Sequence, residues 1–124
     1  MLKNNKDTVL LSKLKNALEE GSASNIVVLD AGTQNPYFGY FIIATGTCAA
    51  HLTSLTKVIT EAMQGGDYSL RSSEGKREGK WILMDFGYIV IHLLDNDTRE
   101  FYDLDGIWAG AEKVQFANIP YLAD

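Results

Sequence analysis

The sequence predicts a single α/β (α+β) domain in which two main helices accompany about five strands. Two stretches carry apolar residues at helical spacing, and short β-prone runs lie between and after them. A length of 124 residues provides for one hydrophobic core and is too short for two. We therefore expect one domain over residues 1–124 with its core at about 8–110, and residues 111–124 are a candidate for a loose tail.

Both helices have recognisable ends. The first is expected over residues 7–20, with Asp7 as its N-cap and Gly21 at its C-terminal stop. The second follows Gly46, with Thr47 placed to cap it, and ends before Gly65. The apolar stripes that predict a buried face are Leu10, Leu14, Ala17 and Leu18 in the first helix and Leu52, Leu55, Ile59 and Ala62 in the second.

Five β-prone runs supply the strands, at residues 26–29, 40–45, 68–71, 80–86 and 88–94. The first two runs are continuously apolar, which is typical of strands buried on both faces. Gly87 separates the last two runs and indicates a tight hairpin. Residues 31–39 and 72–79 are expected to be loops, and residues 99–108 to include a short strand or helix.

Composition narrows the classes of function. The net charge of −5 disfavours nucleic acid as the main direct contact, because phosphates require a basic surface. The apolar runs are far shorter than the roughly 20 residues that cross a bilayer, and no signal-peptide pattern opens the chain. Cys48 is the only cysteine, so it has no partner for a disulfide or a zinc site. We therefore expect a cytoplasmic protein without membrane contact, metal ion or other cofactor.

Residues suited to catalysis are isolated in the sequence. Cys48 precedes His51 by one helical turn, yet a cysteine in this setting is more often a small packing residue. Asp85 lacks the second carboxylate of a two-metal site and is more simply a turn residue before a glycine. His92 is most simply a hydrogen-bonded interior histidine, and Gly46 alone is no phosphate-binding motif. We therefore predict that the protein is not an enzyme.

The run at 80–86 offers a recognition surface. Alternation places Trp81, Leu83 and Asp85 on one face of a strand and Ile82, Met84 and Phe86 on the other. Since two helices cover one face of a sheet well, one of these sets is a candidate for exposure and for contact with a partner. Residues 99–105 place two aromatic side chains among four charges, another mixture typical of interfaces. The alternative is that Trp81 and Tyr102 are buried in the core.

Five stretches of the sequence resemble the ribosomal silencing factor family, whose members are also called Iojap-like proteins. They are IVVLD at 26–30, YFIIATG at 40–46, EG at 74–75 with GKWILMDFG at 79–87, IVIH at 89–92, and REFYDL at 99–104 with Trp108. They follow the family's order and spacing, and the pair WILMDFG and REFYDL is specific. The sequence departs from the family at Gly39 and Tyr88, where members often carry Asp, and at Cys48, where Ser is common.

The resemblance implies a fold similar to nucleotidyltransferases, a mixed sheet with two main helices packed on it, without the catalytic carboxylates. It implies a bacterial or organellar translational repressor that binds the large ribosomal subunit through ribosomal protein L14. Bound there, such a protein sterically blocks association with the small subunit, and a role in large-subunit biogenesis is also implied. Carried over to this sequence, the contacts are Trp81, Leu83, Asp85, Tyr102, Asp103 and Leu104, with little or no direct nucleic acid contact.

Two alternatives stay open. The first is a degenerate nucleotidyltransferase-like enzyme or nucleotide-binding domain with a site near Gly46 and Asp85, which depends on fold analogy alone. The second is a homodimer that covers the Trp81 face until a ribosome competes for it.

Overall fold

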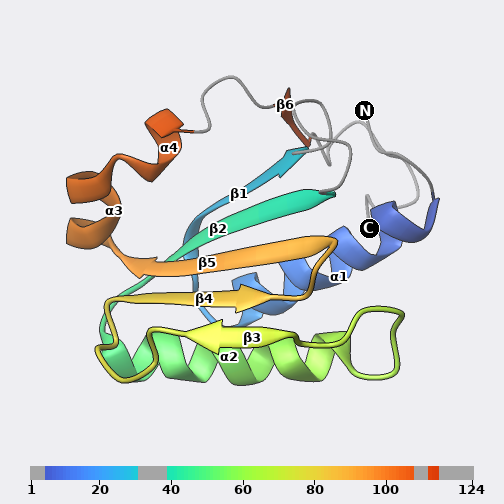
Figure 1. Ribbon diagram of the computed structural model, residues 1–124, viewed down its shortest axis with the longest axis horizontal. Coiled ribbons are helices and arrows are strands. Elements are labelled where there is room, and N and C mark those ends of the chain that lie inside the picture. The colour runs from blue at the N-terminus through green and yellow to red at the C-terminus, as the bar shows by residue number, and fades with distance from the viewer. Residues whose placement is uncertain (1–4, 31–38, 108–111, 115–124) are drawn as a thin grey trace.

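The computed structural model describes residues 5–30, 39–107 and 112–114, and Figure 1 shows their arrangement. The predicted long helices and four of the five predicted strands are confirmed, with small differences at their ends. None of the helices in these ranges is long and apolar enough to cross a membrane. The elements are α1 (Asn5–Glu20), β1 (Ser24–Asp30), β2 (Tyr40–Gly46), α2 (Ala49–Met63), β3 (Ser72–Glu74), β4 (Trp81–Asp85), β5 (Ile89–Asp95), α3 (Asn96–Tyr102), α4 (Leu104–Ile107) and β6 (Glu112–Lys113).

The strands form one mixed sheet in the order β3-β4-β5-β2-β1-β6. β2 and β5 run parallel at its centre, and all other neighbouring strands are antiparallel. The predicted mixed sheet with two main helices is therefore confirmed. It has one more strand than the expected set, because Glu112 and Lys113 pair with Asp30 and Leu29 at the edge of β1. These two residues lie in the segment 111–124 that was a candidate for a loose tail.

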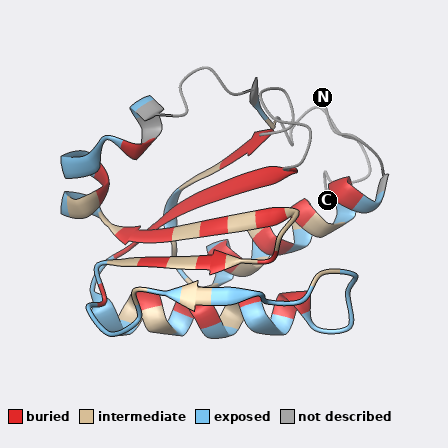
Figure 2. Ribbon diagram, in the orientation of Figure 1, coloured by how far each residue is buried: buried red, intermediate tan, exposed pale blue. Residues whose placement is uncertain are grey.

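α1 and α2 pack on one face of the sheet and enclose the main core. Figure 2 shows the central strands as largely buried, with exposed residues along the outer faces of the helices. Burying a side chain the size of leucine contributes about 1.5 to 3 kcal/mol, so this face supplies most of the fold's stability. Its fully buried residues include Leu11, Leu14 and Leu18 of α1, Leu52, Leu55 and Ile59 of α2, and Ile82, Met84, Ile91 and Leu93 of the sheet.

The opposite face of the sheet carries a second, smaller core, to which α4 contributes Leu104. Figure 1 shows α3 and α4 at the end of the sheet where β5 finishes. Successive strand residues point to opposite faces, so this cluster takes the residues that alternate with those of the main core. Its buried members are Leu29, Phe41, Ile43, Leu94 and Leu104, with Val27, Trp81 and Val90 partly buried beside them. Among the described residues, Leu104 of α4 is thus the buried residue that a short helix adds to this face of the sheet.

Three local predictions are wrong. The strand expected at residues 68–71 begins later, as β3, because the amide of Arg71 bonds to the carbonyl of Asp85 and pairing proceeds from Ser72. The loop expected at 72–79 therefore includes that strand. Thr47 does not cap α2, since the N-cap is Cys48 and the Thr47 hydroxyl lies instead 3.2 Å from Nδ1 of His51.

Asp7 joins α1 to the sheet, although the sequence suggested only a helix cap. α1 begins before it, and its carboxylate is buried and accepts hydrogen bonds from the hydroxyls of Tyr88 at 2.8 Å and Tyr40 at 3.3 Å. Burial and this carboxylate raise the pKa of Tyr88, which therefore remains a donor. A Cβ at Gly39 would lie 2.6 Å from the Tyr88 ring, so the tyrosine occupies the space that the glycine leaves.

We expect Tyr88→Phe to lower the free energy of unfolding by about 2 kcal/mol, because a buried carboxylate loses a charge-assisted hydrogen bond. Urea unfolding measures the change. Tyr68→Phe is the matched control, since Tyr68 stacks on Tyr88 with ring centroids 5.2 Å apart and the substitution keeps that ring. Equal effects of the two substitutions would contradict a specific role for the Asp7 contact.

Candidate partner-binding site

β4 presents Trp81, Leu83 and Asp85 on the face opposite the main core. All three are half-buried, whereas Ile82 and Met84 between them are fully buried. The predicted alternation along this strand is therefore confirmed. The face with tryptophan and leucine is the one that α1 and α2 leave uncovered.

Trp81 is fixed from two sides. Its indole Nε1 donates a hydrogen bond to Nδ1 of His92 on β5, at 3.1 Å. The ring of Tyr102, from the end of α3, packs against the indole with centroids 5.1 Å apart at an angle of 53°. The structure thus brings together Trp81 and Tyr102, which are far apart in the sequence and which the resemblance grouped as contact residues.

α3 reaches this position through two polar contacts with the sheet. The Asp95 carboxylate caps the helix by accepting a hydrogen bond from the Thr98 amide at 2.8 Å, and bonds from Thr98 lower the pKa of Asp95. Arg99 is buried, and its Nη1 donates to the carbonyl of Asn25 at 2.7 Å and to Oγ1 of Thr45 at 2.9 Å. These bonds fix the rotation of α3, and with it the direction of the aromatic residues that follow Arg99.

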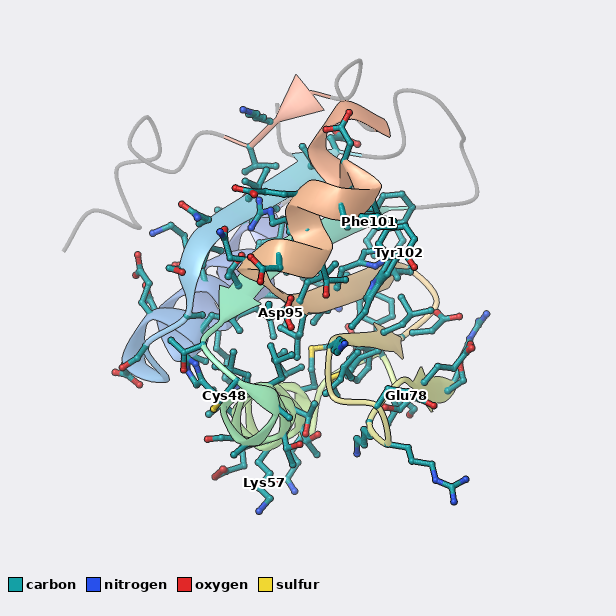
Figure 3. All side chains as sticks on the ribbon, turned by 90° about the vertical axis from the view of Figure 1, so that its left-hand side faces the viewer. Cys48, Lys57, Glu78, Asp95, Phe101 and Tyr102 are labelled. Carbon is teal, nitrogen blue, oxygen red and sulfur yellow. The ribbon has the colours of Figure 1, made fainter. Side chains whose placement is uncertain are left out.

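Phe101 and Tyr102 project from α3 into solvent, as Figure 3 shows. Tyr102 is 52% exposed and Phe101 81% exposed, and their rings meet edge to face with centroids 4.9 Å apart. We call Trp81, Leu83, Phe101 and Tyr102 the aromatic surface. Sequence analysis did not select Phe101, although it lies in the mixed segment 99–105. An exposed apolar side chain of this size is a common sign of an interaction site.

Asp103 and Leu104 have different environments although they are adjacent. Asp103 is exposed and has a left-handed backbone conformation with φ 48°, and its carboxylate accepts a hydrogen bond from Gly106 at 3.2 Å. Leu104 is 3% exposed and packs in the second core. The prediction that Leu104 contacts a partner directly is corrected, because a side chain so buried cannot reach one. Leu104 instead packs α4 onto the sheet.

Asp85 lies at the far end of β4 from Trp81 and shapes the hairpin. Its Oδ1 accepts a hydrogen bond from the Gly87 amide at 2.7 Å, as expected of an aspartate before a glycine turn. Gly46 is at the other end of the sheet, since it pairs with Asp95 whereas Asp85 pairs with Val90. The side chain of Leu52 fills the space above Gly46, where a Cβ would meet it at 2.7 Å. The two residues of the nucleotide-binding alternative therefore do not form a common site.

Cys48 and His51 also fail to form a catalytic pair. Nδ1 of His51 accepts the Thr47 amide at 2.9 Å and Nε2 lies 2.8 Å from the Gly21 carbonyl, so both ring nitrogens have partners. The backbone hydrogen bond from His51 lowers the pKa of the Cys48 thiol. Cys48 is exposed, so the expectation of a packing residue is wrong.

His92 accepts a hydrogen bond from Trp81, as expected, but it is half-buried and not fully interior. Burial lowers its pKa from 6.5 to about 4, because charging the ring would leave a cation largely removed from water. The neutral ring is therefore the form present in the folded protein at neutral pH.

The described residues form a mixed α/β domain with an aromatic surface, a combination typical of proteins that bind other macromolecules. The family described as "Ribosomal silencing factor during starvation" matches residues 4–123 of the chain. The ribosomal silencing factor of Chromobacterium violaceum is 31% identical over 108 residues, which cover 86% of this chain and 88% of the relative. The chain therefore belongs to the ribosomal silencing factor family.

Three further similarities concern one named relative and two solved structures. The mouse protein called "Mitochondrial assembly of ribosomal large subunit protein 1" is 31% identical over 103 residues, covering 79% of this chain and 44% of that protein. A crystal structure of a Chromobacterium violaceum protein matches with a TM-score of 0.75 at 27% identity, covering 91% of this chain and 96% of the other. One from Bacillus halodurans matches with a TM-score of 0.73 at 23% identity, covering 86% and 97%, and shows the fold alone.

The pKa of His92 predicts a pH dependence of folding. Between pH 6.5 and about 4 the unfolded chain binds a proton that the folded protein excludes, so stability falls as pH falls. From pH 7.5 to 4.5, we expect the wild type to lose about 2 kcal/mol more than His92→Leu, which has no titrating group. Urea unfolding at both pH values measures the difference. Identical losses would show that His92 titrates normally in the fold.

Proposed function

We propose that this protein represses translation by binding the large ribosomal subunit through ribosomal protein L14 and blocking association with the small subunit. The aromatic surface is the contact in this proposal, with Asp103 and Asp85 at its edges. The observation that carries it is the packing of Tyr102 on Trp81 beside the most exposed aromatic residue of the described chain, Phe101. Large aromatic side chains of this kind supply most of the energy at protein interfaces.

The acidic side chains on and beside α3 favour a basic partner. Asp97, Glu100 and Asp103 are exposed on or beside α3, whereas Arg99, the one cation of that helix, is buried against the sheet. A proteinaceous partner with lysine and arginine side chains would therefore meet complementary charge. Such complementarity accelerates encounter and fixes the register of a complex more than it adds affinity. Direct contact with nucleic acid phosphates has no part in this proposal.

Repression in this mechanism needs no chemical step. A domain bound where the two subunits meet occupies space that the small subunit requires, so its effect follows from position alone. Under this proposal the protein is not an enzyme and acts in the cytoplasm. The mouse relative carries ribosome assembly in its name, and we extend the proposal to a role in large-subunit biogenesis.

Trp81→Ala should weaken binding to purified large subunits by at least about 2 kcal/mol, the loss typical of a central aromatic anchor. Co-sedimentation across a range of subunit concentrations measures the change. Leu70→Ala is the control, because Leu70 is also a large apolar residue, 43% exposed, and lies outside the aromatic surface. Unchanged binding of folded Trp81→Ala protein would remove this surface from the contact.

Phe101→Ala should weaken binding by about 1 to 2 kcal/mol while leaving the free energy of unfolding nearly unchanged, since an exposed side chain contributes little to folding. The same co-sedimentation and urea unfolding measure the two quantities. Val9→Ala on α1 is the control, because Val9 is 56% exposed on the helical layer of the opposite face. A loss of stability without a loss of binding would assign Phe101 to folding.

A second copy of the chain is the alternative occupant of the aromatic surface. An exposed apolar face favours self-association as well as binding to a partner. Light scattering at increasing protein concentration distinguishes the two, because a homodimer that covers Trp81 must dissociate before large subunits bind. A monomer at tens of micromolar would leave the ribosome as the partner of this surface.

A further inference from the structure

We propose that His92 is a positioning residue whose imidazole fixes the orientation of Trp81 for contact with the partner. This inference rests on the proposed function and adds to it a half-buried residue on the strand beside Trp81. It concerns the hydrogen bond from the indole Nε1 to His92 Nδ1, at 3.1 Å, between two neighbouring strands.

The strand register brings these two side chains together. Trp81 pairs with Leu94 and Leu83 pairs with His92, so Trp81 and His92 are diagonal neighbours on the same face of the sheet. Diagonal positions on antiparallel strands lie within reach of aromatic side chains. The rings accordingly lie with centroids 6.0 Å apart at an angle of 51°.

His92 itself is rigidly placed. Its ring meets Phe41 of β2 edge to face, with centroids 6.2 Å apart at 85°, and its backbone pairs with Ile43. Because Nδ1 accepts the hydrogen bond from the indole N–H, the ring is neutral and its own proton lies on Nε2. A neutral ring suits this half-buried site, because desolvation lowers the pKa of His92.

Two neighbours, His92 and Tyr102, hold the indole of Trp81 in place. His92 satisfies the indole N–H from within the sheet, and Tyr102 packs on the ring from α3. An anchor already in its bound orientation loses less conformational freedom when the complex forms. Without the acceptor, the indole N–H would have to turn toward water, and Tyr102 would lose the surface against which it packs.

A double-mutant cycle tests this role. His92→Leu keeps a side chain of similar size without the acceptor, and should weaken binding to purified large subunits by about threefold to tenfold, the equivalent of one neutral hydrogen bond. His92→Asn retains an oxygen acceptor in place of Nδ1 and should bind within about twofold of the wild type. In a Trp81→Phe background, where no indole N–H exists, His92→Leu should have no further effect.

Several results would overturn the inference. Wild-type binding by His92→Leu, or equal weakening of the wild type and of Trp81→Phe by His92→Leu, would show that His92 does not act through the indole. If Trp81→Ala weakens binding while His92→Leu does not, the positioning role fails and the proposed function stands. If Trp81→Ala binds like the wild type, the aromatic surface itself is not the contact and both ideas fail.

Proton exchange in the wild-type protein gives a test that needs no stable His92 variant. The indole N–H of Trp81, identified by its absence from Trp81→Phe, should exchange with solvent at least about tenfold more slowly than that of free tryptophan because it is hydrogen-bonded. Nuclear magnetic resonance measures this rate directly. Exchange at the rate of free tryptophan would exclude the fixed orientation.

Discussion

The structure depends on one constraint, which is that two long helices cover only one face of a mixed sheet. α1 and α2 bury the residues of β2, β4 and β5 that point toward them. The residues that alternate with these are also largely apolar, and burying them is favourable. Among the described residues, the short helices α3 and α4 cover only part of this second face. Trp81 and Leu83 remain half-buried at the margin, and this incompletely covered part of the sheet is the surface that we propose for partner binding.

Arg99 affects both the position of α3 on the sheet and the charge that α3 exposes. Its guanidinium is buried against Asn25 and Thr45, which ties α3 to β1 and β2 and fixes the direction of Phe101 and Tyr102. Because the one cation of α3 is used inside the fold, the outward side of the helix is left acidic. The same residue therefore orients the aromatic side chains and leaves acidic residues as the exposed charges of α3. Surfaces that combine rigid aromatic anchors with complementary charge gain both affinity and specificity.

Local patterns in the sequence predicted much of the sheet and half of the site. The alternation from Trp81 to Asp85, the hairpin at Gly87, the turn role of Asp85 and the hydrogen-bonded His92 each depend on a few neighbouring residues, and each is confirmed. The resemblance to known family motifs added the pairing of Trp81 with Tyr102, which no local pattern contains.

The remaining features depend on contacts between distant parts of the chain. The exposure of Phe101 depends on the rotation of α3, and Arg99 sets this rotation through residues 74 and 54 positions away. The sequence around Asp7 suggests a helix cap. Its partner Tyr88 lies 81 positions along the chain, where no local pattern can indicate the contact. β3 has three residues at a sheet edge, too few to show an alternating pattern.

We propose that this surface binds the large ribosomal subunit and excludes the small one. The most direct measurement is subunit joining in a purified system, followed by light scattering after large subunits are incubated with the protein. We predict that the wild-type protein suppresses joining in proportion to the large subunits it occupies, and that the folded Trp81→Ala protein does not at the same concentration. Normal joining with large subunits saturated by wild-type protein would contradict the claim.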